Sequence, residues 1–196
     1  MTLDVYESLP EDLARGIEVV DGTVIVCHSP SDKHQAVQHA LLNVLSDAAR
    51  KYDQSKGTCH RVRAGIDVLL TEVPFHFRTP DLTVFRCLGG GQPGRWQGKP
   101  KASDTLIVVE IVSPGSRSED TLVKRVRYAR AGIQHYWIVR LAQDDGPANS
   151  VERLRLISDG TYATEQVAFR KKDILAVDAL DPFEAAIAWE QLDEWL

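Results

Sequence analysis

The sequence has few cysteines, no long apolar run and no repeated segment. Its three cysteines, Cys27, Cys59 and Cys87, are an odd number in no CxxC arrangement, which argues against a disulfide framework and favours a reducing cytoplasm. No apolar run approaches the ~20 residues that a membrane-spanning helix needs. The acidic first residues also lack the basic-then-apolar order of a secretion signal. We therefore expect a cytoplasmic protein without a membrane segment.

A phosphate-binding P-loop is also missing, because the glycine-rich stretch at 88–94 is not followed by Gly-Lys-Ser/Thr. The remaining composition is that of an ordinary globular protein, with 43% hydrophobic and 26% charged residues. A chain of 196 residues buries about 70% of its unfolded surface and builds a core unaided. We expect one domain spanning residues 1–196.

The net charge of −5 hides an uneven distribution along the chain. Residues 1–32 sum to −6, residues 33–132 to +7 and residues 173–196 to −7. A basic middle between acidic ends can present a positive surface to phosphates. The alternative is an ordinary solvated surface with scattered charge.

Hydrophobic periodicity predicts two helices and several strands. Apolar residues recur on one helical face from about 32 to 50, after a capping Ser31 or Asp32. A second helix starts near Ser116 or Ser118 and ends at Gly132. The predicted strands are an N-terminal hairpin followed by runs at 62–70, 80–85, 105–112 and 136–139, and a hairpin at 151–156 and 162–169.

The strand–helix–strand passage at 105–139 implies a parallel strand pair with a right-handed crossover. The expected fold is therefore α/β (α+β), a mixed sheet flanked by helices. Its core spans about 32–140, with β additions at both ends. The hairpin at 151–169 and an acidic C-terminal segment at 173–196 complete the domain.

Glu110 is the chemical anomaly of the sequence, because it lies within the apolar run Thr-Leu-Ile-Val-Val-Glu-Ile-Val at 105–112. An ionised carboxylate in such a strand costs several kcal/mol unless a positive charge meets it. Three explanations are open at this point: a buried salt bridge, a raised pKa with a neutral acid, or a bound cation.

Asp81 favours the cation. It begins the preceding strand, and the 19 residues at 86–104 are long enough for the two strands to pair. Two carboxylates on neighbouring strands repel each other unless a cation lies between them. Mg²⁺ prefers oxygen ligands at about 2.0–2.1 Å and is commonly held by one or two carboxylates plus substrate phosphate. We therefore expect Asp81 and Glu110 to hold Mg²⁺ or Mn²⁺.

A lysine is the third expected element of this site. Position 112, which shares the strand face of Glu110, is Val112. The next helix offers Asp120 and Lys124 at i, i+4, and Lys124 could point back over the end of the strand. The alternative is a surface ion pair that contributes about 0.3–0.5 kcal/mol.

These residues resemble the Uma-two family of restriction-endonuclease-like proteins in the PD-(D/E)XK nuclease superfamily. The resemblance covers about residues 17–190 and is most specific from 104 to 139. The matching segments are Ile17 to Gly22, Ser29-Pro30, His34-Gln35, Pro80-Asp81, Val108 to Pro114, Asp120, Lys124, Tyr128 to Ile133 and Tyr136 to Val139.

The resemblance implies a restriction-endonuclease-like αβββαβ core, Mg²⁺-dependent phosphodiester cleavage of DNA and self-association as a homodimer. It assigns Asp81 and Glu110 as metal ligands, and Lys124 as the catalytic lysine moved from strand to helix. Asp120 would orient Lys124 or an outer water. Val112 replaces the superfamily's usual Glu-x-Lys lysine, which this migration explains.

Three further residues are weaker candidates. Glu18 matches a family position and could complete the metal shell. His34 could contact phosphate or water, or make a hydrogen bond at the helix start. Ser113 could bind phosphate or cap the strand–helix turn. The leading function is a metal-dependent endonuclease; the alternative is a catalytically silent, dimeric nucleic-acid-binding or scaffold protein that keeps the fold.

Overall fold

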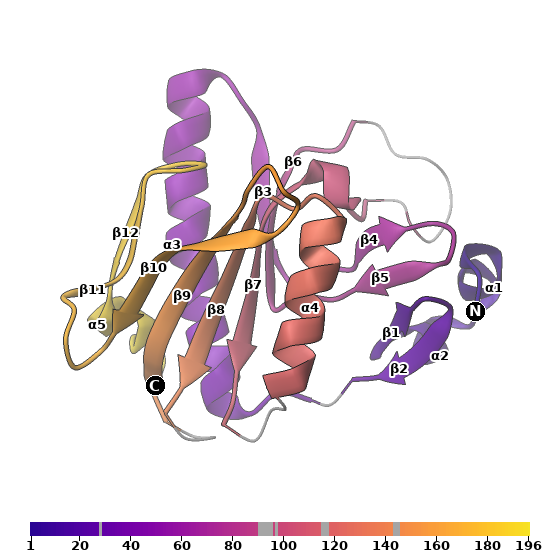
Figure 1. Cartoon of the computed structure of the whole chain (residues 1–196), viewed down its shortest axis with the longest axis horizontal. Coiled ribbons are helices and arrows are strands. Elements are labelled where there is room, and N and C mark those ends of the chain that lie inside the picture. The colour runs from indigo at the N-terminus through magenta and orange to yellow at the C-terminus, as the bar shows by residue number, and fades with distance from the viewer. Residues whose placement is uncertain (28, 90–95, 97, 115–117, 143–145) are drawn as a thin grey trace.

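The computed structural model describes residues 1–27, 29–89, 96, 98–114, 118–142 and 146–196, without the side chains of 118–120. Its centre is a six-stranded sheet in the order β10-β9-β8-β7-β6-β3 (Figure 1). The strands are β3 (His60–Ala64), β6 (Leu82–Arg86), β7 (Thr105–Val112), β8 (His135–Leu141), β9 (Ala148–Leu156) and β10 (Tyr162–Phe169).

β7 and β8 are the parallel pair of this sheet, and the other neighbouring strands are antiparallel. The helix α4 (Ser118–Arg130) lies between β7 and β8 in the chain. The predicted parallel strand pair with a helix between its strands, and the mixed sheet flanked by helices, are therefore confirmed. The strand at 105–112 has the predicted bounds, because its unbroken β-branched run suits a strand that is buried on both faces.

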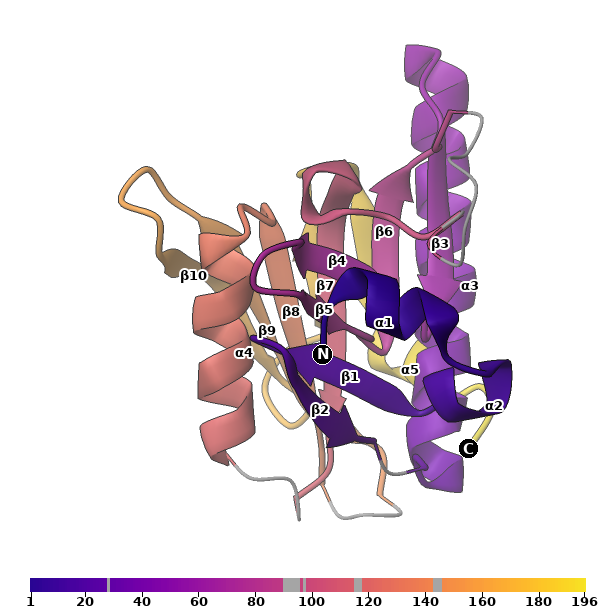
Figure 2. The same cartoon turned by 90° about the vertical axis from the view of Figure 1, so that its right-hand side faces the viewer.

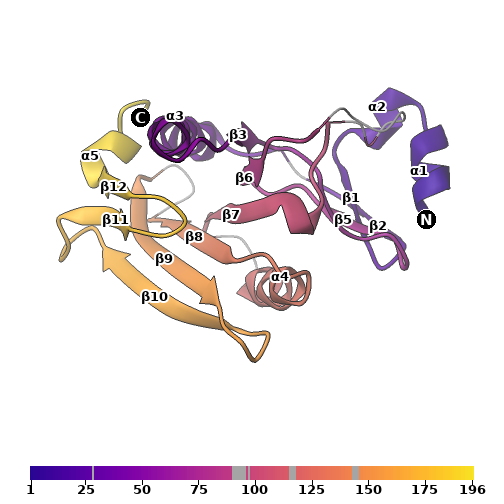
Figure 3. The ribbon, with the colours of Figure 1, turned by 90° about the horizontal axis from the view of Figure 1, so that it is seen from above.

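Helices and a small hairpin cover the two faces of the six-stranded sheet (Figure 3). On one face lie α3 (Asp32–Lys56), the hairpin β11 (Leu175–Ala179) and β12 (Ala185–Ala188), and α5 (Trp189–Leu192). On the other face lies α4, whose Tyr128 packs with Val108 and Ile138. Because side chains alternate along β7, Ile107 and Val109 join the α3 core while Val108 joins the α4 core.

The helix α3 begins as predicted and ends later than predicted. The Ser31 hydroxyl accepts the backbone N–H of His34, which caps the first turn. The helix continues to Lys56 because Gly57, at φ 66°, adopts the left-handed conformation that ends it. Its last turns carry no apolar stripe, so the periodicity alone placed the end near residue 50.

A second, four-stranded sheet stands beside the first, in the order β2-β1-β5-β4 (Figure 2). It contains the predicted N-terminal hairpin, and two short helices precede that hairpin in the chain. Its aromatic core joins Tyr6, Phe75 and Phe77. The elements are α1 (Leu3–Ser8), α2 (Glu11–Ala14), β1 (Ile17–Val20), β2 (Thr23–Val26), β4 (Val68–Thr71) and β5 (His76–Arg78), and the 3₁₀ turn η1 (Ala102–Asp104) precedes β7.

The prediction of one strand at 62–70 is wrong. The chain turns at Gly65, whose φ of 56° suits glycine. The first half of the segment pairs with β6 as β3, and the second half joins the other sheet as β4. The second sheet thereby comes to lie against the end of the first.

Cys59 and Cys87 form a disulfide. The register that places His60 opposite Arg86 brings them together, with Cα atoms 5.3 Å apart. The sequence argued against a disulfide framework and did not predict this bridge. A count of three cysteines does not reveal which two lie close together in the fold. Cys27 is a free thiol and lines a cleft described below.

We expect reduction of this disulfide to lower the free energy of unfolding by about 3.6 kcal/mol, because the closed loop spans 28 residues. Urea unfolding with and without reductant measures the change. The double variant Cys59→Ser/Cys87→Ser is the control and should unfold like the reduced protein. Equal midpoints for oxidised and reduced wild type would contradict the prediction.

Across the described ranges, no helix combines the length and the apolar character that a bilayer crossing requires.

Candidate functional site

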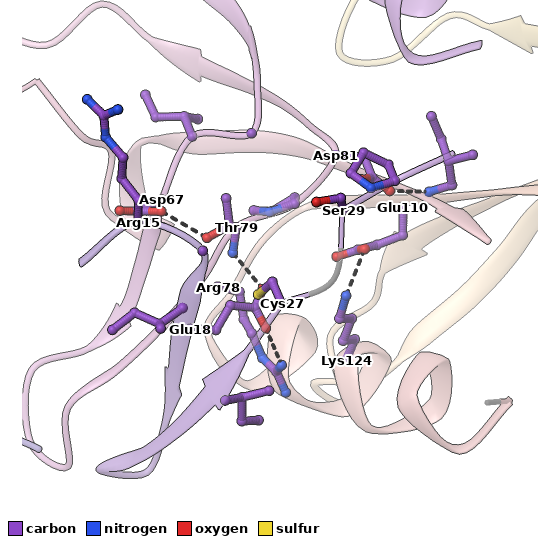
Figure 4. Close-up of a pocket in the computed structure, with 18 of the residues that line it drawn as sticks. Arg15, Glu18, Cys27, Ser29, Asp67, Arg78, Thr79, Asp81, Glu110 and Lys124 are labelled. Carbon is purple, nitrogen blue, oxygen red and sulfur yellow. Dashed lines mark hydrogen bonds and ion pairs between the residues drawn. The ribbon is translucent and has the colours of Figure 1, made fainter. Parts of the chain in front are cut away.

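The register of β6 and β7 brings Asp81 and Glu110 together. Leu82 pairs with Val109 in this antiparallel ladder, so the preceding residue Asp81 comes opposite Glu110. Directly opposite residues of an antiparallel pair project from the same face of the sheet. Figure 4 shows both side chains in one pocket, with Lys124 directed at Glu110.

Glu110 is held from α4 by two donors. The Lys124 Nζ atom lies 2.9 Å from Oε2, and the Tyr128 hydroxyl donates to Oε1 over 2.7 Å. The side chain of Glu110 is only 8% exposed. Burial raises the pKa of Glu110 to about 7, Lys124 opposes the rise, and the charge of Asp81 adds to it. The buried acid therefore combines two of the explanations left open by the sequence, a salt bridge and a raised pKa.

This pKa shift predicts a pH dependence of stability in the metal-free protein. A carboxyl whose folded pKa is raised contributes stability that is complete below its unfolded value, about 4.5, and is lost as the pH rises through about 7. We therefore expect Glu110→Gln to lose less stability than wild type between about pH 5 and pH 8. Urea unfolding in EDTA measures this, with Glu190→Gln, an exposed carboxylate on α5, as the control. Parallel pH profiles for Glu110→Gln and wild type would contradict the prediction.

Asp81 is anchored by the neighbouring strand and by α3. Its Oδ2 accepts the backbone N–H of Ile111 over 2.6 Å and lies 3.3 Å from His34 Nε2. The same His34 nitrogen is 3.1 Å from the carbonyl oxygen of Ile111, which can only accept, so Nε2 carries the proton. Burial lowers the pKa of His34, but the hydrogen bond and charge of Asp81 outweigh it, and the net shift is upward. His34 therefore orients the Asp81 carboxylate.

These groups lie in a cleft of about 1470 Å³. One wall is the end of the six-stranded sheet with α4, and it includes Ser113 after β7. The facing wall comes from the N-terminal hairpin, which contributes Ile25, and from Cys27, which follows β2 and is labelled in Figure 4. Burial raises the pKa of the Cys27 thiol to about 11, and the Glu18 charge adds to the rise, so this thiol is a weak nucleophile.

Glu18 lines the same cleft but is engaged elsewhere. Its Oε2 lies 2.6 Å from Arg78 Nη1, and its Oε1 accepts the backbone N–H of Thr79 over 2.8 Å. Both charged side chains are almost fully buried, at 6% exposed for Glu18 and 4% for Arg78. This geometry makes Glu18 half of a buried ion pair, and its predicted part in a metal shell stays a prediction.

The structure brings together four of the residues that the sequence singled out: Asp81, Glu110, Lys124 and His34. Sequence reasoning did not identify Tyr128 as part of this group. The available signal was its spacing, because Lys124 and Tyr128 are i, i+4 neighbours on one helix face. Asp120 lies in the first turn of α4, but its side chain falls outside the described part of the structure, so its predicted role stays a prediction. Ser113 lines the cleft, and its predicted contact with phosphate stays a prediction.

The donor set fits a hard divalent cation. Two carboxylates on the same face of adjacent strands are the protein ligands with which Mg²⁺ is commonly held, the rest being water and substrate oxygens. The negative charges of Asp81 and Glu110 repel each other, which helps to raise the pKa of Glu110. A divalent ion between the two carboxylates would relieve this repulsion. Across the described residues, no group of three or more His, Cys, Asp or Glu could hold an ion unaided.

Comparison with known proteins gives a family and solved structures of similar fold. A model of the family Uma2, described as "Putative restriction endonuclease", matches residues 3–188. A crystal structure of a "putative nuclease belonging to DUF820" from Anabaena variabilis ATCC 29413 is similar with a TM-score of 0.65. The two are 18% identical, over 100% of this chain and 98% of that chain. No protein of curated function matches the sequence.

Proposed function

We propose, because the chain belongs to the Uma2 family of restriction-endonuclease-like proteins, that it is a divalent-metal-dependent endonuclease acting on DNA. The observation that carries this proposal is the juxtaposition of Asp81 and Glu110 on adjacent strands, with Lys124 at 2.9 Å from Glu110, inside a cleft. Two carboxylates and an ammonium so arranged suit the hydrolysis of a phosphodiester.

Asp81 and Glu110 would hold Mg²⁺ or Mn²⁺. Such an ion lowers the pKa of a bound water and stabilises the charge that builds on the scissile phosphate. His34 and the backbone N–H of Ile111 keep the Asp81 carboxylate in one orientation. Tyr128 does the same for Glu110 by its hydroxyl.

Lys124 has two tasks in this scheme. Its ammonium opposes the effect of burial on Glu110 and so favours the ionised carboxylate that a metal needs. From α4 its ammonium would also lie beside the scissile phosphate and stabilise the negative charge that develops there. Asp120 would orient Lys124, and Ser113 would contact phosphate at the end of β7.

Cleavage of supercoiled plasmid and of single-stranded circular DNA tests the proposal. We expect purified protein to cut DNA with Mg²⁺ or Mn²⁺, and EDTA to abolish the activity. Both substrates staying intact at every metal and protein concentration would contradict the proposed function.

A second candidate function has a specific observation in its favour. Glu110 already has internal partners in Lys124 and Tyr128, as a catalytically silent, nucleic-acid-binding or scaffold protein with a nuclease fold would require. Calorimetric titration with Mn²⁺ separates the two. Heat of binding that disappears in Glu110→Gln supports the nuclease, and no heat in wild type supports the silent protein.

We propose further that the protein assembles as a homodimer. Exposed apolar residues on the edge strand β2 support self-association. The exposed fractions are 42% for Val24 and 70% for Val26. Sedimentation equilibrium measures the assembly, and a monomer at every concentration would contradict it.

A further inference from the structure

We propose that the cleft takes an unpaired strand of nucleic acid and excludes the intact duplex. The inference rests on the proposed function and adds the class of substrate. Three features of the cleft carry it: its depth, the pairing of its cations and its apolar lining residues.

The reactive groups are recessed beneath a second wall. The exposed fractions of the side chains are 8% for Glu110, 15% for Lys124 and 21% for Asp81. The hairpin of β1 and β2 faces them across the cleft (Figure 4). Arg127 of α4 forms an ion pair with Asp21 in the turn of this hairpin, which ties the two walls together. The cleft volume of about 1470 Å³ is smaller than the major groove of a single duplex turn, roughly 12 Å wide, 8.5 Å deep and 34 Å long, so the duplex itself does not fit inside.

The cations that line the cleft already have acidic partners. Lys124 pairs with Glu110 and Arg78 with Glu18, as described above. Lys99 lies 2.5 Å from Asp67, and Arg15 pairs with Glu11. Binding of a duplex relies on lysines and arginines that replace counterions along the phosphate backbone. Among the described lining residues, a substrate would therefore gain less from its phosphates than from contacts to its bases, which a duplex keeps stacked.

Apolar side chains line part of the cleft. Ile25 comes from β2 and Ile66 from the turn after β3, and the cross-strand neighbour of Ile25 is Glu18, whose charge is paired with Arg78. Ile25 is 39% exposed. Apolar side chains can contact a base only when the base is unstacked, which is the state of bases in a single strand or a loop. The cleft thus offers contacts to unpaired bases that it cannot offer to a duplex.

Equilibrium binding tests the inference independently of cleavage. One oligonucleotide sequence, as a single strand and as its blunt duplex, is titrated with the full-length protein in Ca²⁺, and fluorescence anisotropy is recorded. We expect the single strand to bind about tenfold more tightly than the duplex, since contacts to unstacked bases are lost on pairing. Duplex binding of equal or greater strength, or no binding of either form, would overturn the inference.

Two substitutions of exposed apolar residues locate the contact. Ile25→Glu places a negative charge in the cleft and should weaken single-strand binding about tenfold. Val167→Glu is the matched control, because Val167 is 45% exposed on the strand β10 and does not line the cleft. Equal binding by the two variants would overturn the inference.

A stem–loop substrate with Mg²⁺ distinguishes this inference from the proposed function. Cleavage confined to the loop supports both, and equal cleavage of stem and loop supports the nuclease while overturning strand selection. Preferential single-strand binding without cleavage of any substrate keeps the inference and contradicts the nuclease.

Discussion

Asp81→Asn and Glu110→Gln should each lower the rate of Mg²⁺-dependent cleavage by about a thousandfold. Each change keeps the shape of the side chain and removes one of the two negative charges that would hold the ion. Metal-assisted stabilisation of the transition state amounts to several kcal/mol, and each 1.4 kcal/mol is a factor of about ten in rate. Single-turnover cleavage of a labelled substrate measures the loss.

The matched control is Glu190→Gln on the distant α5, which should cleave at the wild-type rate. Calorimetry on the same variants should show that Mn²⁺ binding is lost with Asp81→Asn and Glu110→Gln and kept with Glu190→Gln. Wild-type cleavage by either cleft variant would remove that residue from the catalytic site. A loss of cleavage with unchanged Mn²⁺ affinity would contradict its role as a metal ligand.

Arg78→Met should lower the free energy of unfolding by about 3–5 kcal/mol, because it leaves the buried Glu18 carboxylate without its charge partner. The Arg78 guanidinium and the Glu18 carboxylate lie 2.6 Å apart on neighbouring strands β5 and β1. Urea unfolding by circular dichroism measures the loss.

The double variant Glu18→Leu/Arg78→Met should recover much of that stability, since replacing both members of a buried pair by apolar residues is often nearly neutral. A double variant as unstable as the single one would show that the lost charge partner is not the cause. Glu18→Gln gives the other test of this residue. Abolished Mn²⁺ binding with unchanged stability would make Glu18 a metal ligand instead of a structural anion.

The long elements of the fold could be predicted from the sequence, and the junction between its two sheets could not. The apolar run at 105–112 and the stripe of α3 have clear periodicity over many residues. The helices α1 and α2 have six and four residues, too few for a periodic signal. Gly65 separates β3 from β4, but alternation of side chains continues across the turn and does not reveal that the chain changes sheets.

The sequence predicted which elements carry the site residues, but not the tertiary contacts that orient their side chains. Asp81 and Glu110 could be assigned to neighbouring strands, and Lys124 to the following helix, from their order in the chain. The orienting groups depend on tertiary contacts: the Ile111 N–H reaches Asp81 across 30 positions, and the Tyr128 hydroxyl reaches Glu110 across 18. The Arg78 partner of Glu18 is 60 positions away, so sequence spacing alone could not distinguish an ion pair from a metal ligand.

The most direct measurement is anomalous X-ray scattering from a crystal of the wild-type protein soaked in Mn²⁺. We predict one strong peak between the carboxylates of Asp81 and Glu110, at about the 2.0–2.1 Å from their oxygens expected of an oxygen-bound ion of this size, and its absence from crystals of Glu110→Gln. An empty position between those carboxylates, with Lys124 still paired to Glu110, would contradict metal-dependent hydrolysis in this cleft.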